Sequence, residues 1–205
     1  MLRFTMRTSY LIGLLLASSF LLAQTEFSAE IVDTQKPGTP AQAKVYFGKD
    51  KIRLDPLGGN RMGAIIMNLT TQTFTALMAQ QHMYMEMPVQ MASQRVAYNF
   101  FRTGDAESAC ADWMQVVKNK GGTCHKAGSE TVNGRDTVKY ETTNANGDSG
   151  TFWLDSKLRF AVKWKSKNGG GELRNIQEGT QPASLFEIPA GFTKTDVGGM
   201  MQRPQ

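Results

Sequence analysis

The chain has 205 residues, 40% of them hydrophobic and 20% charged, with a formal net charge of +5. That length fits one domain with a sizeable core. Removing Arg3 and Arg7, which precede an apolar leader, reduces the 23 basic residues to 21 against 18 acidic ones. The resulting net charge of +3 is too small to indicate nucleic-acid binding, which usually requires a clustered basic face.

The N-terminus, residues 1–23, has the layout of a signal peptide. Arg3 and Arg7 precede a short apolar run from Leu11 to Ala23, and polar residues follow it directly. The run is short and lacks a stop-transfer flank, so we expect cleavage after Ala23 rather than membrane insertion. No later segment approaches the roughly 20 apolar residues that a membrane helix needs. We therefore expect a periplasmic or, alternatively, a secreted protein, with no transmembrane segment in the mature chain.

Apolar residues at every second position dominate the chain from residue 27 to residue 87. This period predicts strands near 27–31, 45–47, 52–54, 63–69, 73–78 and 82–87, separated by turn residues. The strand at 63–69 has apolar residues at both odd and even positions, so we expect it to be buried on both faces. Short connections between these strands predict a meander in an antiparallel sheet.

The period changes in the middle of the chain. From Val89 to Phe100, apolar residues recur at three- and four-residue steps, which is typical of an amphipathic helix. A second helix is predicted from Ala106 to Val117, capped by Asp105 and ended by the glycines at 121–122.

Strand patterning then resumes to the end of the domain. Asn133-Gly134, between extended runs at 130–132 and 137–140, predicts a hairpin. Further strands are expected near 152–154, 158–165 and 169–178, and an apolar segment at 185–192 closes the domain. In 158–165 the apolar residues alternate with Arg159, Ala161, Lys163 and Lys165, which predicts one core face and one solvent face.

The expected fold is mainly β (α+β). It is a large curved antiparallel sheet, or half-barrel, of about ten strands, whose concave face is covered by the central helical insert. Residues 24–195 form one domain, and residues 196–205 form a flexible tail without periodicity.

The two cysteines, Cys110 and Cys124, both lie in the exported part of the chain. An oxidising compartment and their close spacing favour a disulfide over two free buried thiols.

The order of elements resembles the LolA/LolB-like superfamily of periplasmic lipoprotein carriers. It more closely resembles a related family of exported domains of unknown function. The second resemblance is carried by the run from Glu130 to Glu141, the closing run from Phe186 to Phe192, and the two cysteines. The resemblance implies an apolar cavity under a helical lid, and in the superfamily such cavities accept acyl chains or other lipids.

We expect no enzymatic activity and no cofactor. Only His82 and His125 could serve a hydrolytic triad, and neither lies in a recognisable nucleophile motif. The acidic residues are scattered and form no spaced acid and base pair.

Met83, Met85 and Met87 share one face of a strand, with Met78 and Met91 on either side in the sequence. Thioethers suit Cu(I), but His82 has the opposite parity, which disfavours a shared metal site. We therefore favour methionines that line an adaptable apolar surface, and we expect no metal site.

The leading hypothesis is a carrier or binding module for an apolar small molecule or a lipid acyl chain. One alternative is an envelope module that docks a protein partner through a sheet edge, and another is methionine-based copper binding. The expected ligand-binding residues lie on the sheet and on the helical insert: Met67, Phe74, Met78, Met83, Met85, Met87, Phe100, Trp113 and Met114.

Overall fold

The computed structural model describes residues 25–58, 63–88, 103–117, 121–167 and 169–195. The predicted signal peptide, the first predicted helix with Phe100, and the predicted tail fall outside these residues. The described elements comprise twelve strands, one α-helix and two short 3-10 turns. In chain order they are β1 (Phe27–Asp33), β2 (Ala43–Phe47), β3 (Lys51–Pro56), β4 (Ile65–Asn68), β5 (Thr73–Met78), η1 (Ala79–Gln81), β6 (Met83–Pro88), α2 (Ala109–Val117), β7 (Thr123–Val132), β8 (Arg135–Thr143), β9 (Ser149–Asp155), β10 (Phe160–Ser166), β11 (Gly169–Glu178), η3 (Ala183–Phe186) and β12 (Thr193–Lys194).

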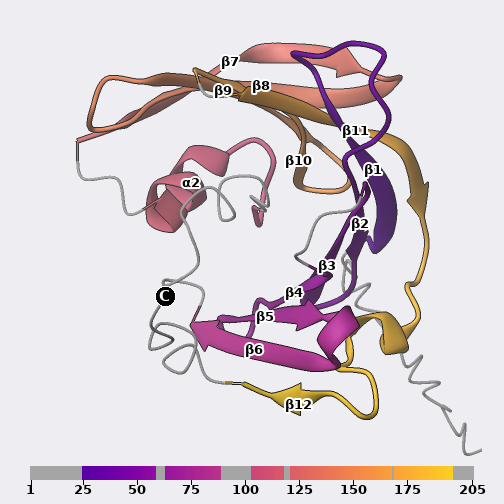
Figure 1. Ribbon diagram of the computed structural model, residues 1–205. Helices are drawn as coiled ribbons and strands as arrows, with labels where there is room; N and C mark the ends of the chain where they lie inside the picture. The colour runs from indigo at the N-terminus through magenta and orange to yellow at the C-terminus, as the bar shows by residue number, and fades with distance from the viewer. Residues whose placement is uncertain (1–24, 59–62, 89–102, 118–120, 168, 196–205) are drawn as a thin grey trace, which may run out of the picture.

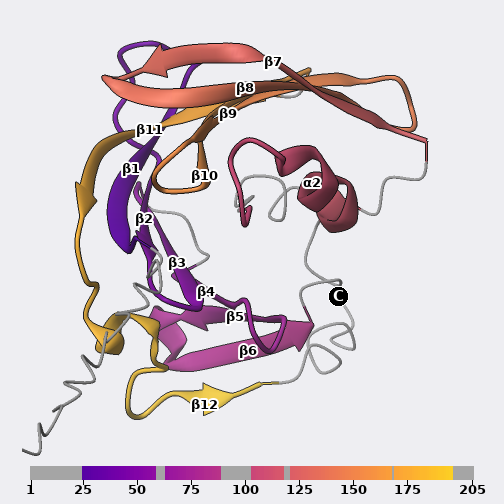
Figure 2. The same cartoon turned by 180° about the vertical axis from the view of Figure 1, so that it is seen from behind.

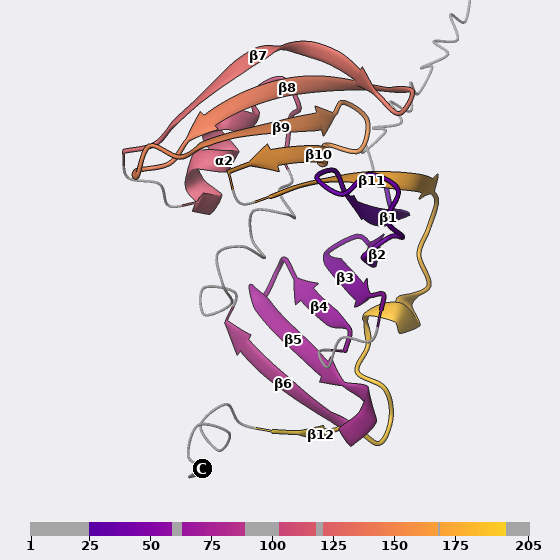
Figure 3. The same cartoon turned by 45° about the horizontal axis from the view of Figure 1, so that its top comes forward.

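All twelve strands belong to one open sheet in the order β12-β6-β5-β4-β3-β2-β1-β11-β10-β9-β8-β7. Every pairing is antiparallel except that of β12 with β6, which is parallel. Figure 1 shows the sheet bent into an arch, with β7–β9 at one end and β6 and β12 at the other. With the top of the molecule tilted forward, the same order can be followed in reverse, from β7 to β12 (Figure 3). The expected curved half-barrel is confirmed, with twelve strands rather than about ten.

The helix α2 lies inside the arch, beneath β7–β9, in both the front and the reverse view (Figures 1 and 2). Its Trp113 ring stacks on Phe152 of β9 with 6.5 Å between the ring centroids. The buried Tyr140 hydroxyl of β8 donates to the Ala106 carbonyl at 2.8 Å and accepts from the first helical amide, Ala109, at 3.4 Å. The expectation that a helical insert covers the concave face is confirmed for this helix.

A disulfide joins Cys110 of α2 to Cys124 of β7, as predicted, with 5.5 Å between the Cα atoms. The bond closes the connection between the helix and the edge strand. Together with the Tyr140 hydroxyl, it anchors α2 to the β7–β8 end of the arch.

The largest apolar cluster lies at the middle of the arch, where β1, β2 and β10 meet. Phe27 and Phe47 stack with 5.2 Å between ring centroids, and the Phe160 ring meets both edge-on at 5.6 and 5.1 Å. A second cluster contains the inward residues of β8 and β9 and the docked face of α2, and Trp164 packs against both clusters. The concave side is therefore apolar along most of its length.

The closing segment after β11 covers the outer side of β3. The Arg53 guanidinium donates to the Leu185 carbonyl at 2.8 Å, and the Phe186 ring is buried against Gly48. A Cβ at Gly48 would lie 2.8 Å from that ring, so a larger residue at this position would displace the ring. Beyond it, β12 pairs with the outer edge of β6.

Three local expectations need correction. The alternation across 158–165 is broken by a bulge between Ala161 and Lys163, so Ala161 is buried in the second cluster instead of facing solvent. His82 is not in a strand, because it has a left-handed backbone (φ 49°) that ends η1. The strand expected at 130–132 begins earlier, at Thr123, because β8 continues to pair with it up to Thr143.

The expectation of a strand buried on both faces at 63–69 is confirmed. In β4, the successive residues Ile65, Ile66 and Met67 are all buried. Within the described ranges, no helix has the length and hydropathy needed to cross a membrane.

Candidate ligand-binding surface

Strand pairing extends the face covered by α2 along the whole sheet. Paired residues of neighbouring strands share a face. Phe152 pairs with Trp164 and Trp164 with Gly171, so the α2 side continues across β10 and β11. It then passes through β1 into β2, where Ile31 pairs with Ala43. The inward residues of β2–β6 therefore lie on the concave side of the arch.

We call these inward residues the concave wall. The pairs Val45–Leu54, Leu54–Ile65, Ile65–Ala76 and Ala76–Met85 run across it in one row. Every member is apolar, whereas the charged and hydroxyl side chains of the same strands have the opposite parity and face outward. The concave wall consists of Ala43, Val45, Phe47, Ile52, Leu54, Pro56, Ile65, Met67, Phe74, Ala76, Met78, Met83, Met85 and Met87.

Six of the predicted ligand-binding residues lie together on this wall, and their burial is graded along it. Met67 and Phe74 are 4% and 7% exposed and belong to the main core cluster, and Met87 packs against that cluster. Met78, Met83 and Met85 are half-buried and belong to neither of the two described clusters. The hairpin end of β5 and β6 therefore has apolar side chains that are not part of either described core cluster.

The predicted residues of α2 lie on the other half of the concave side. Trp113 is 6% exposed and Met114 is half-buried, and both pack against the β8–β9 cluster. Their contacts dock the helix onto the sheet, so Trp113 has little surface left for a ligand. Phe100 lies outside the described residues.

The sequence prediction missed several members of the wall, namely Leu54, Ile65 and Ala76. Each shows the same alternating pattern as the methionines, so strand parity was the available signal. That Leu54, Ile65 and Ala76 lie opposite one another depends on the register between strands, and alternation within one strand does not reveal that register.

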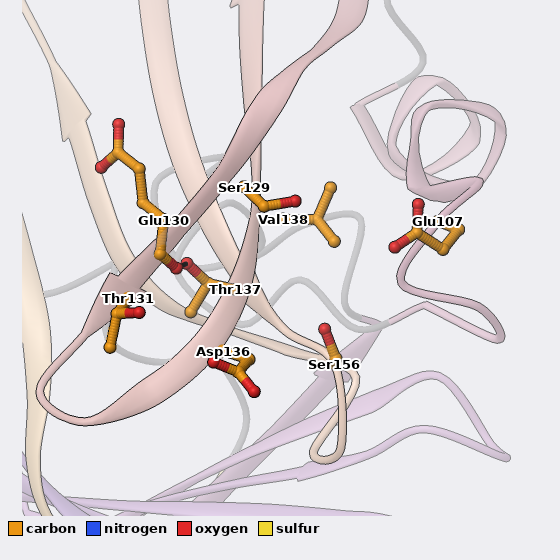
Figure 4. Close-up of a pocket in the computed structure, with 8 residues that line it drawn as sticks. All are labelled: Glu107, Ser129, Glu130, Thr131, Asp136, Thr137, Val138 and Ser156. Atoms are coloured by element: carbon orange, nitrogen blue, oxygen red, sulfur yellow. Dashed lines mark hydrogen bonds between the residues drawn. The ribbon is translucent and has the colours of Figure 1, made fainter.

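A polar hollow of about 230 Å³ lies at the far end of the arch, along β7 and β8. Figure 4 shows Glu107, Ser156 and the β7–β8 residues around it, with the Glu130 carboxylate pointing away from Ser129 and Val138. Its lining consists of Glu107, Ser129, Glu130, Thr131, Asp136, Thr137, Val138 and Ser156.

Two of the carboxylates around this hollow already have partners. Glu107 forms an ion pair with Lys126. The Trp153 indole N–H donates to Glu130 at 2.7 Å, and this bond, followed by the Lys139 ammonium, lowers the pKa of the Glu130 carboxyl. The polar character of this hollow contrasts with the apolar concave wall.

The two histidines lie far apart in the sheet order and have different neighbours. His125 is exposed on β7 with its Nε2 3.4 Å from Glu141, and the His82 ring meets Phe192 edge-on with 5.7 Å between centroids. Within the described ranges, no three His, Cys, Asp or Glu side chains form a group that could hold a metal ion.

Comparison with known proteins returns matches among solved structures alone. No family model matches the chain, and no curated protein matches it. An uncharacterised conserved protein from Thermus thermophilus is similar over 85% of this chain and 92% of its own length, with a TM-score of 0.53 and 8% identity. PNGF-II is similar over 86% of this chain with a TM-score of 0.50 and 11% identity, and the match covers only 32% of PNGF-II.

A LolA superfamily protein from Nitrosomonas europaea is also similar, over 80% of this chain and 90% of its own, with 10% identity and a TM-score of 0.30. At these identities, the two higher-scoring matches establish a shared fold, a curved antiparallel sheet, and nothing about function.

Proposed function

We propose that the protein is an exported, non-enzymatic carrier or binding protein that holds an apolar ligand, such as a lipid acyl chain, against the concave wall. The observation that carries this proposal is that the wall has no charged or hydrogen-bonding side chain on β2–β6, all of whose residues are described. The half-buried methionines at its end favour a ligand of variable shape, because unbranched thioether chains adapt to irregular partners. The disulfide supports export, since such bonds persist in oxidising compartments.

Apolar burial alone would drive this binding. Each methylene removed from water contributes about 0.8 kcal/mol, which corresponds to roughly a fourfold change in Kd. Saturated fatty acids of increasing length should therefore compete with a fluorescent fatty-acid probe in steps of about fourfold per methylene until the wall is covered. An affinity that does not depend on chain length would contradict the proposal.

A matched pair of substitutions on β6 tests the position of the ligand. Met85→Asp places a carboxylate on the concave wall, whereas Tyr84→Asp places it on the opposite face of the same strand. A carboxylate that must be desolvated without a partner costs several kcal/mol, so Met85→Asp should raise the Kd of the probe by at least about tenfold. Tyr84→Asp should leave the Kd within about twofold, because surface changes away from the site have small effects. Equal losses in both variants would refute binding at the wall.

A second candidate is a protein-interaction module that uses the free edge of β7. This ten-residue strand is mostly exposed, and no described strand pairs with its outer side. Such an edge can accept an extended segment of a partner as an added strand. The bulge between Lys126 and Gly128 limits the regular part of this edge, so we rank this candidate second. A photoreactive residue at Thr131 that cross-links an envelope protein in cells, while one at the exposed Lys157 does not, would favour it.

A further inference from the structure

Three methionines at the β5–β6 hairpin are not accounted for by the core. Met78, Met83 and Met85 are half-buried on the concave wall, and neither described apolar cluster includes them. Met67 and Met87, on the same wall, differ because they belong to the main cluster or pack against it. Among the described residues, cluster membership thus separates the wall methionines into a group packed with the main cluster and a group outside both clusters.

The hairpin brings Met78, Met83 and Met85 together from two strands. Met78 is the last residue of β5, η1 makes the turn, and Met78 pairs directly with Met83. Directly opposite residues have Cβ atoms about 4.5–5.5 Å apart, and diagonal neighbours such as Met78 and Met85 are about 7–8 Å apart, within reach of long side chains. Met83 and Met85 project from the same face of one strand. Three flexible thioethers can therefore converge on one point.

The surroundings restrict what such a point can bind. On β5 and β6 the concave side has no carboxylate, hydroxyl or imidazole, since Glu86 and Thr75 face outward as a pair. The His82 ring, at the end of η1, lies edge-on to Phe192 with 5.7 Å between the ring centroids. Hard cations such as Mg²⁺ and Ca²⁺ require oxygen ligands, whereas neutral thioethers are soft ligands that select Cu(I).

We propose that Met78, Met83 and Met85 bind one Cu(I) ion through their three thioether sulfurs. The ion stays Cu(I) on binding, no bond of the protein changes, and the low polarity of the wall disfavours competing oxygen ligands. This site goes beyond the apolar-ligand function and does not depend on it.

Anaerobic titration with Cu(I), supplied as its weak acetonitrile complex, tests the site. Native mass spectrometry of the purified protein should show one bound copper per chain. X-ray absorption should show sulfur neighbours alone. A protein that takes up no copper, or nitrogen in the first coordination sphere, would overturn the proposal.

Leucine variants separate this site from the apolar function. The triple variant Met78→Leu, Met83→Leu, Met85→Leu conserves side-chain volume and apolar area while it removes the sulfurs. Changing residues that only support metal ligands costs roughly 10- to 100-fold in metal affinity. Removing the three ligands themselves should therefore raise the Kd for Cu(I) by more than about 100-fold. The matched control Met67→Leu, Met87→Leu should bind Cu(I) as the parent does.

Urea unfolding serves as the second measurement on the same variants. An unfolding midpoint close to that of the parent shows that the triple variant is folded, so a loss of Cu(I) is then a loss of the ligands. If the triple variant still binds Cu(I) like the parent, or if the control loses it equally, the assignment to these three methionines is wrong. The single variant Met78→Leu changes the fold least, and its Kd for Cu(I) should rise by at least about tenfold.

Discussion

Replacing Tyr140 with phenylalanine tests how the helix is held inside the arch. Tyr140 is 1% exposed, and its hydroxyl bonds the Ala106 carbonyl at 2.8 Å and the Ala109 amide at 3.4 Å. Both alanines are buried, and the first amides of a helix have no partner within the helix, so water cannot replace the lost hydroxyl. Leaving a buried polar group without a partner costs about 1–3 kcal/mol. The bond to Ala109 is long and contributes less than the bond to Ala106.

We therefore expect Tyr140→Phe to lower the free energy of unfolding by about 2 kcal/mol, which corresponds to a fall in Tm of roughly 4–8 °C for a chain of this size. The ring itself is kept, so the stack on Phe152 at 5.1 Å is preserved. Equilibrium unfolding in urea, followed by tryptophan fluorescence, gives the change.

Tyr46→Phe is the matched control, because Tyr46 is half-buried on the outer side of β2 and Lys44 lies over its ring. Its loss should stay below about 0.5 kcal/mol. If Tyr140→Phe costs no more than this control, the hydroxyl does not anchor α2 as described.

Three further outcomes follow from the same structure. Replacing Cys110 and Cys124 with serine should destabilise the protein by about 3 kcal/mol, as the chain-entropy model gives for a loop of this length, and alkylation of the native protein without reductant should add no mass. The Lys157 ammonium is the main cause that lowers the pKa of Glu178 below its ordinary 4.5. The ionised Glu178 carboxylate therefore stabilises the fold above about pH 4.5, and this stabilisation is lost as the pH falls through the depressed pKa. Glu178→Gln should lower Tm at pH 7 and make Tm fall less steeply in acid. Phe47→Ala, in the ring stack at the centre of the arch, should cost about 3–5 kcal/mol in urea unfolding, and a loss below about 1 kcal/mol would show that the cluster is not the core.

Most strands could be predicted from the sequence because their alternation is local. The six strands expected between residues 27 and 87 are present, and the Asn133-Gly134 hairpin lies where its turn residues indicate. The disulfide followed from cysteine spacing and the predicted export. In each case the signal lies within a few residues of the feature.

The concave wall could be predicted only in part, because its composition depends on register. Parity placed Met83, Met85 and Met87 on one face, but it could not place Met78 opposite Met83 or Leu54 opposite Ile65. The bulge after Ala161 likewise has no local signal in the alternation. Strand β12 is two residues long and pairs with β6 from the far end of the chain, so no periodicity could reveal it.

The central claim is that the concave wall carries an apolar guest. Native mass spectrometry of the protein, expressed in a bacterium from the full sequence and purified without detergent, tests this most directly. We expect a bound species whose mass matches a lipid or fatty acid, which Met85→Asp greatly reduces and Tyr84→Asp retains. A spectrum of bare protein, together with no uptake of added fatty acid, would contradict the claim.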